Sequence, residues 1–552
     1  MTSRRLIEIK RFYVICGILE LFLFKEILMI VSDPRLVKLR QIITENLRIQ
    51  RGNDERLLYI DPSSVLTDVC AKQNHTIFAR RGCGKTLLLH SSTRQLDGTV
   101  KAVYLNCEDF KRHSFPNVLI EILDALFGEL EKHLMGWFGR ARASRELIRE
   151  IRAELAKKRV AADQSQEAIK TTLAKEANRG ITAGATGGLS GGGEANVKAE
   201  LGDQRREETE RTFIVHGDKL HDLDTWLPRL KQQVRDFFAT SKSVKAVFLQ
   251  VDDFYLLKRV DQPFVVDYIH RLCKDVPLFF KLATLRHASV LYADRNGQPF
   301  GAQERHDYQP INIDYNLSDF RRTRDQNLQI LREFAKLAGI NPAEEVESLF
   351  KGEGFDRLVM AGGGVPRDTL SLFLEMLQTV QAQSGDRIGK DDVRILSRSN
   401  FERRIEELKA DSEGSDQDTL MKGIYVLREF CLEKQSNVFM LSERLLQQQD
   451  ELRNLVYRLL DYRIIHSAGV ALTHKSQPGT FQAFSIDIGC YAHLRKLDGR
   501  FSELDISLPD AKERMRSAPV LEEQQFQGFW AKAPAQVTAE ELNSMEDAPT
   551  SR

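Results

Sequence analysis

The chain has 552 residues, of which 42% are hydrophobic and 29% charged, which is enough for several folded cores and about three or four domains. Its 80 Lys and Arg residues balance 79 Asp and Glu residues at a net charge of +1, which excludes a strong overall attraction to nucleic acid. The cysteines lack the paired spacing of metal ligands and fit a reducing cytoplasm. They are Cys16, Cys70, Cys83, Cys107, Cys273, Cys431 and Cys490.

The first apolar run, residues 12–31, follows four basic residues and has the outline of a signal or anchor segment. Two glutamates and a lysine interrupt it, and a charge at the bilayer centre costs roughly 2.5–3.5 kcal/mol. The sequence therefore predicts a packed amphipathic helix within residues 1–56 and no membrane span. The alternative is an over-long reading frame with translation starting at Met29.

The segment Thr76–Leu89 is a short apolar strand, a glycine-rich loop ending in Gly84-Lys85-Thr86, and the start of a helix. Backbone N–H groups and the positive end of a helix bind anions, so this order predicts a cradle for a β–γ phosphate pair. Lys85 would place a positive charge on those oxygens, and Thr86 would offer its hydroxyl to Mg²⁺. The predicted binding residues are Ala79, Arg80, Arg81, Gly82, Cys83, Gly84, Lys85 and Thr86.

One position departs from the usual Gly-x-x-x-x-Gly-Lys-Ser/Thr pattern, because Ala79 stands where the first glycine is expected. Alanine costs little there if the backbone φ angle is negative, and much more if it is positive. A Gly-Lys-Thr turn that occurs by chance is the alternative, and it would not need a strand before it and a helix after it.

A long insertion, at about residues 140–212, separates this loop from the next strand. Arg145–Leu155 has one apolar stripe among charged faces and predicts a long helix or coiled-coil arm. Gly180–Glu194 is so rich in glycine that it predicts a flexible tether. The insertion is either a finger that binds an unknown protein partner or a solvated addition without one.

The segment Lys245–Leu257 is a continuous apolar strand that ends in Asp252 and Asp253, typical of a strand buried on both faces of a parallel sheet. Ligands bind at the carboxyl ends of such strands. We expect Asp252 to hold Mg²⁺, usually through water, and Asp253 to orient or deprotonate the attacking water. A solvated turn or a helix cap would give the same two acids.

A third strand, Pro277–Arg286, carries Thr284 near its end, and from here the order of elements resembles the AAA+ ATPases. The resemblance implies that Thr284 is the polar sensor-1 residue between the acids and the γ-phosphate. An ordinary strand threonine is the alternative. The arginine that completes a neighbouring subunit's site is one of three that follow the strand, namely Arg286, Arg295 and Arg305.

Two helices follow that resemble the AAA+ lid. Leu317–Ala335 repeats apolar residues at helical spacing and can be capped by Ser318 or Asp319. Met360–Thr369 contains three glycines and then Val-Pro-Arg, and it resembles the sensor-2 turn of the origin-recognition initiator branch, here in a bacterial form. This implies that Arg367 reaches the nucleotide phosphates.

A plain glycine-rich loop before a proline-started helix is the alternative for this turn. Further along, Ile388–Leu396 resembles the linker turn that closes the lid in initiator-type proteins.

The region 418–495 has helical patterns at 420–432 and 452–460, followed at 462–486 by a strand pair with a Pro-Gly turn. This is the order of a winged helix, in which the last helix enters the DNA major groove and the strand pair contacts the backbone. Acidic residues interrupt the basic ones, so a protein-binding or packing module is the alternative. The candidate DNA contacts are Arg453, Asn454, Arg458, Arg463, His474 and Lys475.

Together these patterns predict an α/β fold with a P-loop NTPase parallel-sheet core of the AAA+ type, a helical lid and a C-terminal winged-helix-like domain. The predicted bounds are an N-terminal helical segment at 1–56, the ATPase core at 57–316, the lid at 317–410, the winged-helix-like domain at 418–497, and a partly disordered tail at 498–552.

The predicted activity is Mg²⁺-dependent hydrolysis of ATP in the cytoplasm, with Asp253, Thr284 and Arg367 as the catalytic residues. In one hypothesis the nucleotide state drives self-assembly and binding to double-stranded DNA. In the other the protein is a signalling switch, for instance in bacterial defence, that acts on a protein partner.

Overall fold

The computed structural model describes residues 29–47, 59–60, 64–134, 142–159, 221–295, 298–412, 414–491, 501, 503–534 and 537. The apolar run before Met29, the glycine-rich segment 180–194 and the last residues, 538–552, lie outside these ranges. The chain divides into two compact units, each described by itself: a sheet unit, Asp61–Asp314, and a helical unit, which joins Met1–Ile60 to Tyr315–Arg552. Among the described residues no helix has the length and apolar character needed to cross a membrane.

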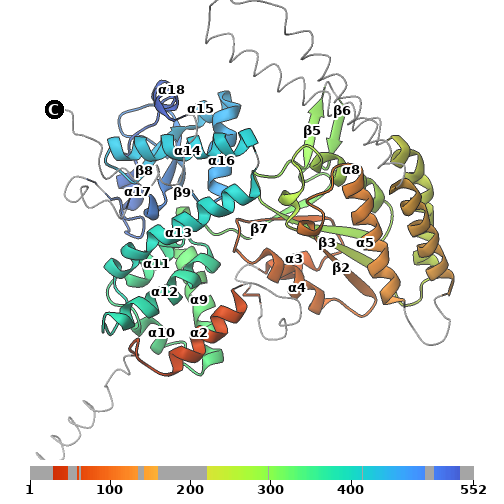
Figure 1. Ribbon diagram of the computed structural model, residues 1–552, viewed down its shortest axis with the longest axis horizontal. Coiled ribbons are helices and arrows are strands. Elements are labelled where there is room, and N and C mark those ends of the chain that lie inside the picture. Colours follow the sequence, from red (N-terminus) through yellow and green to blue (C-terminus); the bar gives the residue numbers. More distant parts are fainter. Residues whose placement is uncertain are drawn as a thin grey trace, which may run out of the picture. The chain divides into compact units, whose positions relative to one another are not determined.

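The sheet unit is built on a five-stranded sheet with the strand order β2-β3-β4-β1-β7 (Figure 1). All neighbouring strands are parallel, which confirms the predicted α/β parallel-sheet fold. Every residue of β3 is buried, as its continuous apolar sequence predicts. The strands are β1 (His75–Phe78), β2 (Val100–Asn106), β3 (Ala246–Asp252), β4 (Leu278–Thr284) and β7 (Gln309–Asn312).

Helices cover both faces of this sheet, and the alternation of side chains along β3 decides which core each residue joins. Val247, Leu249 and Val251 share a core with helices α5 and α8 and with the helical residues 142–159 and 221–240. Phe248 points to the other face, where it packs beside Leu96, the residue that follows α4. The helices are α3 (Val65–Val69), α4 (Lys85–Gln95), α5 (Asn117–His133) and α8 (Gln262–Cys273), with a small β5 (Tyr292–Arg295) and β6 (Gln298–Gly301) hairpin.

The helical unit begins with a group of helices around one apolar core. Asp319 caps the long helix α9, because its carboxylate accepts a hydrogen bond from the Arg322 backbone N–H, so one of the two predicted caps is confirmed. Helix α2, from the predicted N-terminal segment, joins this core, and Arg35 binds Glu345 at 2.7 Å. The helices are α2 (Arg35–Asn46), α9 (Phe320–Ala338), α10 (Glu345–Ser348), α11 (Gly354–Ala361), α12 (Pro366–Ala382) and α13 (Lys390–Asp411), with a short 3₁₀ turn η4 (Leu317–Asp319).

The predicted linker turn at 388–396 is wrong, because α13 begins at Lys390 and runs for 22 residues. The Asp392 carboxylate accepts a hydrogen bond from the Gly389 N–H at 2.7 Å and so satisfies a backbone donor before the helix. Two aspartates in the first turn also complement the positive end of the helix. The predicted turn did not take this capping pattern into account.

The C-terminal part has the order helix, strand, two helices, two strands. The strands form an antiparallel sheet with the order β8-β10-β9, and both predicted helices and the predicted strand pair are present. The elements are α14 (Gly414–Glu433), β8 (Val438–Ser442), α15 (Glu443–Gln448), α16 (Asp450–Asp461), β9 (Ile465–Thr473) and β10 (Thr480–Ile486). A short η5 (Ile488–Cys490) follows, and the tail adds α17 (Ala511–Met515) and α18 (Glu523–Lys532).

The turn before α12 depends on Gly363. Its φ is +61°, and an added Cβ would lie 2.3 Å from the Cε1 atom of His466, whose side chain is buried and bonded to Asp487. Gly352 has a similar φ of +55° but nothing within 4 Å of an added Cβ. Comparing substitutions at these two glycines therefore distinguishes the cost of backbone strain from the cost of steric overlap.

We predict that Gly363→Ala destabilises the helical unit more than Gly352→Ala does. Both variants carry a positive-φ penalty of about 1 kcal/mol, but only Gly363→Ala must also displace a packed ring, which costs roughly 1–3 kcal/mol more. Calorimetric unfolding of both variants measures this difference. Equal losses of stability would show that His466 has room to move.

Candidate functional site

The loop between β1 and α4 has the backbone that a phosphate cradle requires. Gly82 and Gly84 have φ angles of 83° and 91°, in the left-handed region that favours glycine. Ala79 is not among the described residues with a positive φ, so alanine adds no strain at the position where the usual motif has glycine. The departure from the usual motif is therefore compatible with this loop.

Side chains fix the loop from inside. The Lys85 ammonium is buried and donates to the carbonyl oxygens of Ala79 at 2.9 Å and Arg80 at 3.3 Å. The Arg80 guanidinium pairs with Asp314 at 2.8 Å, and the Cys83 thiol lies 3.6 Å from the same carboxylate. Asp314 follows the edge strand β7, so these contacts tie the loop to that strand.

The acid at the end of β3 lies beside the loop. Asp252 is fully buried, and its Oδ2 atom accepts hydrogen bonds from the Thr86 hydroxyl at 2.6 Å and the Tyr104 hydroxyl at 2.9 Å. Its Oδ1 atom accepts from the Asp253 N–H at 2.9 Å. The structure thus joins two motifs that lie 166 residues apart.

Asp253, the next residue in the chain, is an acid with a raised pKa. Burial, followed by the negative charge of Asp252, raises the pKa of Asp253 to about 6, although Lys85 and Arg81 act in the opposite direction. A carboxyl group with a pKa near the working pH is suited to accept a proton. Arg81 itself lies over the Tyr255 ring at 5.7 Å.

Thr284 ends β4, the strand between β3 and β1. Its carbonyl accepts from the Ala79 N–H at 3.3 Å, which places it beside the start of the loop. Its hydroxyl lies 2.5 Å from the Ser289 hydroxyl. The position suits a sensor, while the hydroxyl contact is also what an ordinary structural threonine would make, so its role stays a prediction.

Arg286, one of the three arginines that are candidates for a neighbouring subunit's site, makes contacts within its own unit. It stacks over the Phe78 ring at 4.6 Å and pairs with Glu304 at 3.0 Å. Arg305 has a left-handed φ of 68°, and of the Arg295 side chain nothing is described. Which of them acts on a neighbour stays a prediction.

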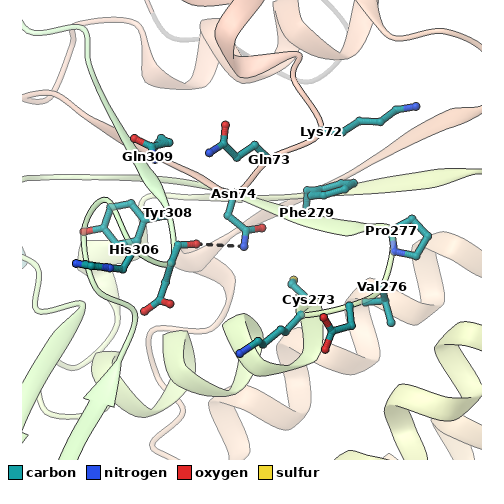
Figure 2. Close-up of a pocket in the computed structure, with 13 residues that line it drawn as sticks. Lys72, Gln73, Asn74, Cys273, Val276, Pro277, Phe279, His306, Tyr308 and Gln309 are labelled. Atoms are coloured by element: carbon teal, nitrogen blue, oxygen red, sulfur yellow. Dashed lines mark hydrogen bonds between the residues drawn. The ribbon is translucent and has the colours of Figure 1, made fainter.

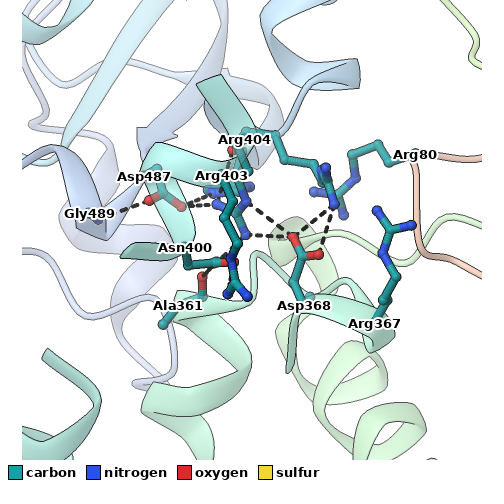
Figure 3. Close-up of polar contacts among 12 residues, drawn as sticks. Arg80, Ala361, Arg367, Asp368, Asn400, Arg403, Arg404, Asp487 and Gly489 are labelled. Atoms are coloured by element: carbon teal, nitrogen blue, oxygen red, sulfur yellow. Dashed lines mark hydrogen bonds and ion pairs between the residues drawn. The ribbon is translucent and has the colours of Figure 1, made fainter. Parts of the chain in front are cut away.

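Arg367 lies in the helical unit, at the second position of α12, and its guanidinium is 3.5 Å from the Glu407 carboxylate. The next residue, Asp368, is the centre of a buried ion cluster (Figure 3). It accepts hydrogen bonds from Arg463 at 2.8 Å and Arg404 at 3.0 Å, and Arg404 also binds Asp487. The reach of Arg367 to a nucleotide stays a prediction.

The glycines before α12 allow close packing around this cluster. A Cβ added to Gly362 would lie 2.3 Å from the Thr369 hydroxyl, and a Cβ added to Gly364 would lie 2.5 Å from a Thr323 methyl. The glycine-rich turn therefore has a packing reason of its own. It brings α12 against β9 and α9 whether or not Arg367 binds a phosphate.

Two of the six candidate DNA contacts are wrong. The Arg463 side chain is 2% exposed and binds both Asp368 and Glu407. The Arg458 side chain is 10% exposed and binds Asp416. Withdrawing a buried cation from its carboxylates costs roughly 3–5 kcal/mol, so neither is available to DNA.

The other candidates at the same part of the chain are more accessible. The Arg453 side chain is 36% exposed and pairs with Asp450 at 2.7 Å, and the Lys475 side chain is 48% exposed and pairs with Glu513 at 3.1 Å. Exposed pairs like these contribute little stability, so the cations can exchange partners.

Sequence reasoning missed Tyr104, Asp314 and Glu407. Asp314 had a signal, because it lies just after the end of a strand, as Asp253 does. Tyr104 had none, since an aromatic residue near the end of a strand is usually part of a core. Glu407 is one of many acids on a charged helix, and only the fold shows that it meets two arginines.

A cavity of about 630 Å³ lies elsewhere in the sheet unit (Figure 2). Its walls come from residues 72–74 before β1, 273–277 before β4 and 306–309 at the start of β7. In a parallel sheet these are the amino ends of the strands, whereas the loop and the acids follow the carboxyl ends. The cavity is therefore separate from the candidate phosphate site.

Comparison with known proteins gives structural similarity only. No protein-family model matches the chain, and no curated protein matches it. A solved structure of the Aeropyrum pernix ORC2 protein in ADPNP and ADP complexes is similar at 13% identity and a TM-score of 0.37, over 89% of this chain and 98% of that one.

Two further solved structures are similar to the chain. The Aeropyrum pernix ORC1 protein in complex with DNA has 11% identity and a TM-score of 0.32, over 81% of this chain and 93% of that one. Drosophila ORC bound to DNA has 11% identity and a TM-score of 0.30, over 84% and 92%. Similarity this low carries no argument about activity or partners.

The ion cluster predicts how the helical unit responds to acid. Burial disfavours the charge of Asp368, but Arg463, Arg404 and Arg367 outweigh it and lower its pKa from 3.8 to about 2. Because the pKa of Asp368 is lower in the folded state, its charge stabilises the fold at pH values above the unfolded-state pKa. This contribution is lost as the pH falls towards the folded-state pKa. The difference corresponds to roughly 2 kcal/mol, lost between about pH 4 and pH 2.

We expect Asp368→Asn to lower stability at neutral pH by about 3 kcal/mol, because it leaves buried arginines with a neutral partner. The same variant should flatten the stability loss between pH 4 and pH 2, as measured by denaturant unfolding. Asp325→Asn is the control, since Asp325 is exposed. If both variants had the same stability and the same pH dependence of unfolding, the cluster would not hold the unit together.

Proposed function

We propose that this chain binds and hydrolyses ATP as a P-loop ATPase of the AAA+ type. The observation that carries this proposal is the 2.6 Å hydrogen bond from Thr86, at the start of α4, to Asp252, at the end of β3. A chance Gly-Lys-Thr turn would not place its threonine on a buried acid at the carboxyl end of another parallel strand of the same sheet.

The residues fit a nucleotide with Mg²⁺. Gly82 and Gly84 keep side chains out of the loop, and Lys85 stands within it as a donor. Thr86 donates its only hydroxyl proton to Asp252, so its lone pairs are left for a cation. Mg²⁺ supplies neutralisation of phosphate charge when it is bound, and Thr86 and Asp252 would hold it.

Asp253 is the proposed base. Its carboxyl group follows Asp252 in the chain, and its raised pKa of about 6 lets it accept a proton from water near neutral pH. Thr284 would orient that water, and Arg367 would stabilise phosphate charge, as the AAA+ resemblance implies. A bacterial source, a cytoplasmic location and assembly into a homo-oligomer remain parts of this proposal.

The C-terminal part is proposed to be a winged-helix domain. The order α14, β8, α15, α16, β9 and β10, with β10 between β8 and β9, supports it. Its best-placed helix for DNA, α16, has Arg458 buried against Asp416. This observation favours the second candidate function, a nucleotide-dependent switch that acts on a protein partner.

We predict that Lys85→Ala lowers ATP affinity by roughly 100-fold, or about 2.7 kcal/mol, because it removes the ammonium aimed at the phosphates. Titration with a fluorescent ATP analogue measures the loss. Lys72→Ala is the matched control, because that lysine lies at the amino edge of the same sheet, beside the cavity. Parent-like affinity in Lys85→Ala would reject the phosphate site.

DNA binding is tested with duplex DNA in the presence of ATP at several salt concentrations. If the domain reads DNA, the double variant Arg453→Glu/Lys475→Glu should bind less tightly, and affinity of the parent should fall with a log–log slope of about −0.9 for each phosphate contact. ATP hydrolysis should be unchanged. No binding by the parent at low salt would reject DNA in favour of the protein-partner switch.

A further inference from the structure

Tyr104 contacts the candidate magnesium-binding acid from the strand next to it. Its hydroxyl lies 2.9 Å from Asp252 Oδ2, the same oxygen that accepts the Thr86 hydroxyl. Asp252 is fully buried, and a buried carboxylate needs such donors to keep its charge. We propose that Tyr104 is a positioning residue that fixes Asp252 for Mg²⁺ binding, an inference that rests on the proposed ATPase function.

The sheet register explains how a tyrosine of β2 reaches this acid. Tyr104 is paired with Gln250 in the parallel β2–β3 ladder, and Asn106 is paired with Asp252. Paired residues share a face, and residues two apart along a strand do too. Tyr104 and Asp252 therefore lie on the same face, two residues apart along the ladder, and a tyrosine side chain is long enough to span that step.

Contacts with α4 identify that face independently. The Gln250 side-chain amide donates to the Leu89 carbonyl and the Ser92 hydroxyl, both at 3.1 Å. The Tyr104 ring lies against the His90 ring of the same helix, with centroids 4.6 Å apart. Tyr104, Gln250 and Asp252 thus all face the helix that carries Thr86, and the His90 contact fixes the direction of the tyrosine.

The hydrogen bonds define what the tyrosine contributes. Oδ2 of Asp252 has two hydroxyl donors, and Oδ1 has the Asp253 N–H, so the carboxylate plane cannot turn without breaking one of them. While Oδ2 accepts the Thr86 proton, the lone pairs of the Thr86 hydroxyl point away from Asp252. Tyr104 therefore holds the acid in the orientation in which Thr86 can ligate a cation.

The size of the effect follows from other metal sites, where losing an outer hydrogen-bond partner costs about 10–100-fold in metal affinity. A tyrosine needed only for packing would behave differently, because phenylalanine keeps the ring against His90. The substitution Tyr104→Phe therefore removes the hydroxyl and little else. Tyr268→Phe is the matched control, because it removes another hydrogen bond in the same unit, to the Leu223 carbonyl at 3.1 Å.

The test uses the full chain and measures binding of a fluorescent ADP analogue while Mg²⁺ is titrated, and again with a chelator present. We expect Tyr104→Phe to require about tenfold more Mg²⁺ for half-maximal effect, with unchanged analogue affinity in chelator and an unfolding midpoint like that of Tyr268→Phe. Mn²⁺ binding followed by electron paramagnetic resonance in the presence of ADP should weaken by the same factor.

Two results would overturn the inference and leave the ATPase function intact. One is a parent that binds nucleotide with a clear Mg²⁺ dependence that Tyr104→Phe does not change. The other is an equal shift in Tyr268→Phe, which would mean that any lost hydrogen bond in the unit has this effect. A parent that binds no nucleotide would reject the proposed function and, with it, the role of Tyr104.

Discussion

The hydrogen bond between Thr86 and Asp252 is the contact on which the sheet unit's candidate site depends. It requires β1 and β3 to end at the same edge of the sheet, which the parallel order β2-β3-β4-β1-β7 provides. It also requires α4 to start directly after the glycine-rich loop, which the left-handed Gly82 and Gly84 allow. The other roles proposed within the sheet unit, that of Tyr104 included, are defined by position relative to this contact.

The helical unit depends on a buried cluster of charged residues. Asp368 and Asp487 lie buried with Arg404 and Arg463, and such a cluster stabilises a fold only when each ion keeps its partners. These residues come from α12, α13, the connection between α16 and β9, and the residue between β10 and η5. Helices α12 and α13 and the C-terminal sheet therefore share one polar core, and Arg367 stands next to it.

Much of the sheet unit could be predicted from sequence, because its signals are local. The β1–loop–α4 segment, the apolar β3 with its two acids, and the strand carrying Thr284 each show a pattern within about a dozen residues. The helices and strand pair near the C-terminus were also predictable from periodicity. The linker turn was not, because the cap at Gly389 and Asp392 converts that segment into the start of a long helix.

Long-range contacts account for what sequence could not supply. Arg458 and Arg463 look like solvent-facing cations in sequence, and only the fold brings Asp416, Asp368 and Glu407 to them. Tyr104 reaches Asp252 from the neighbouring strand, 148 residues away in the chain. Pairings of this kind depend on sheet order and register, which no local pattern encodes.

The most direct test of the central claim is the fate of ATP on the Asp253→Asn variant. We expect the purified variant to bind Mg²⁺ and ATP as the parent does but to release no phosphate in a single-turnover assay, since an amide cannot accept the proton from water. Asp275→Asn, at an exposed acid of the same unit, should hydrolyse ATP like the parent. Parent-like phosphate release by Asp253→Asn would contradict the account.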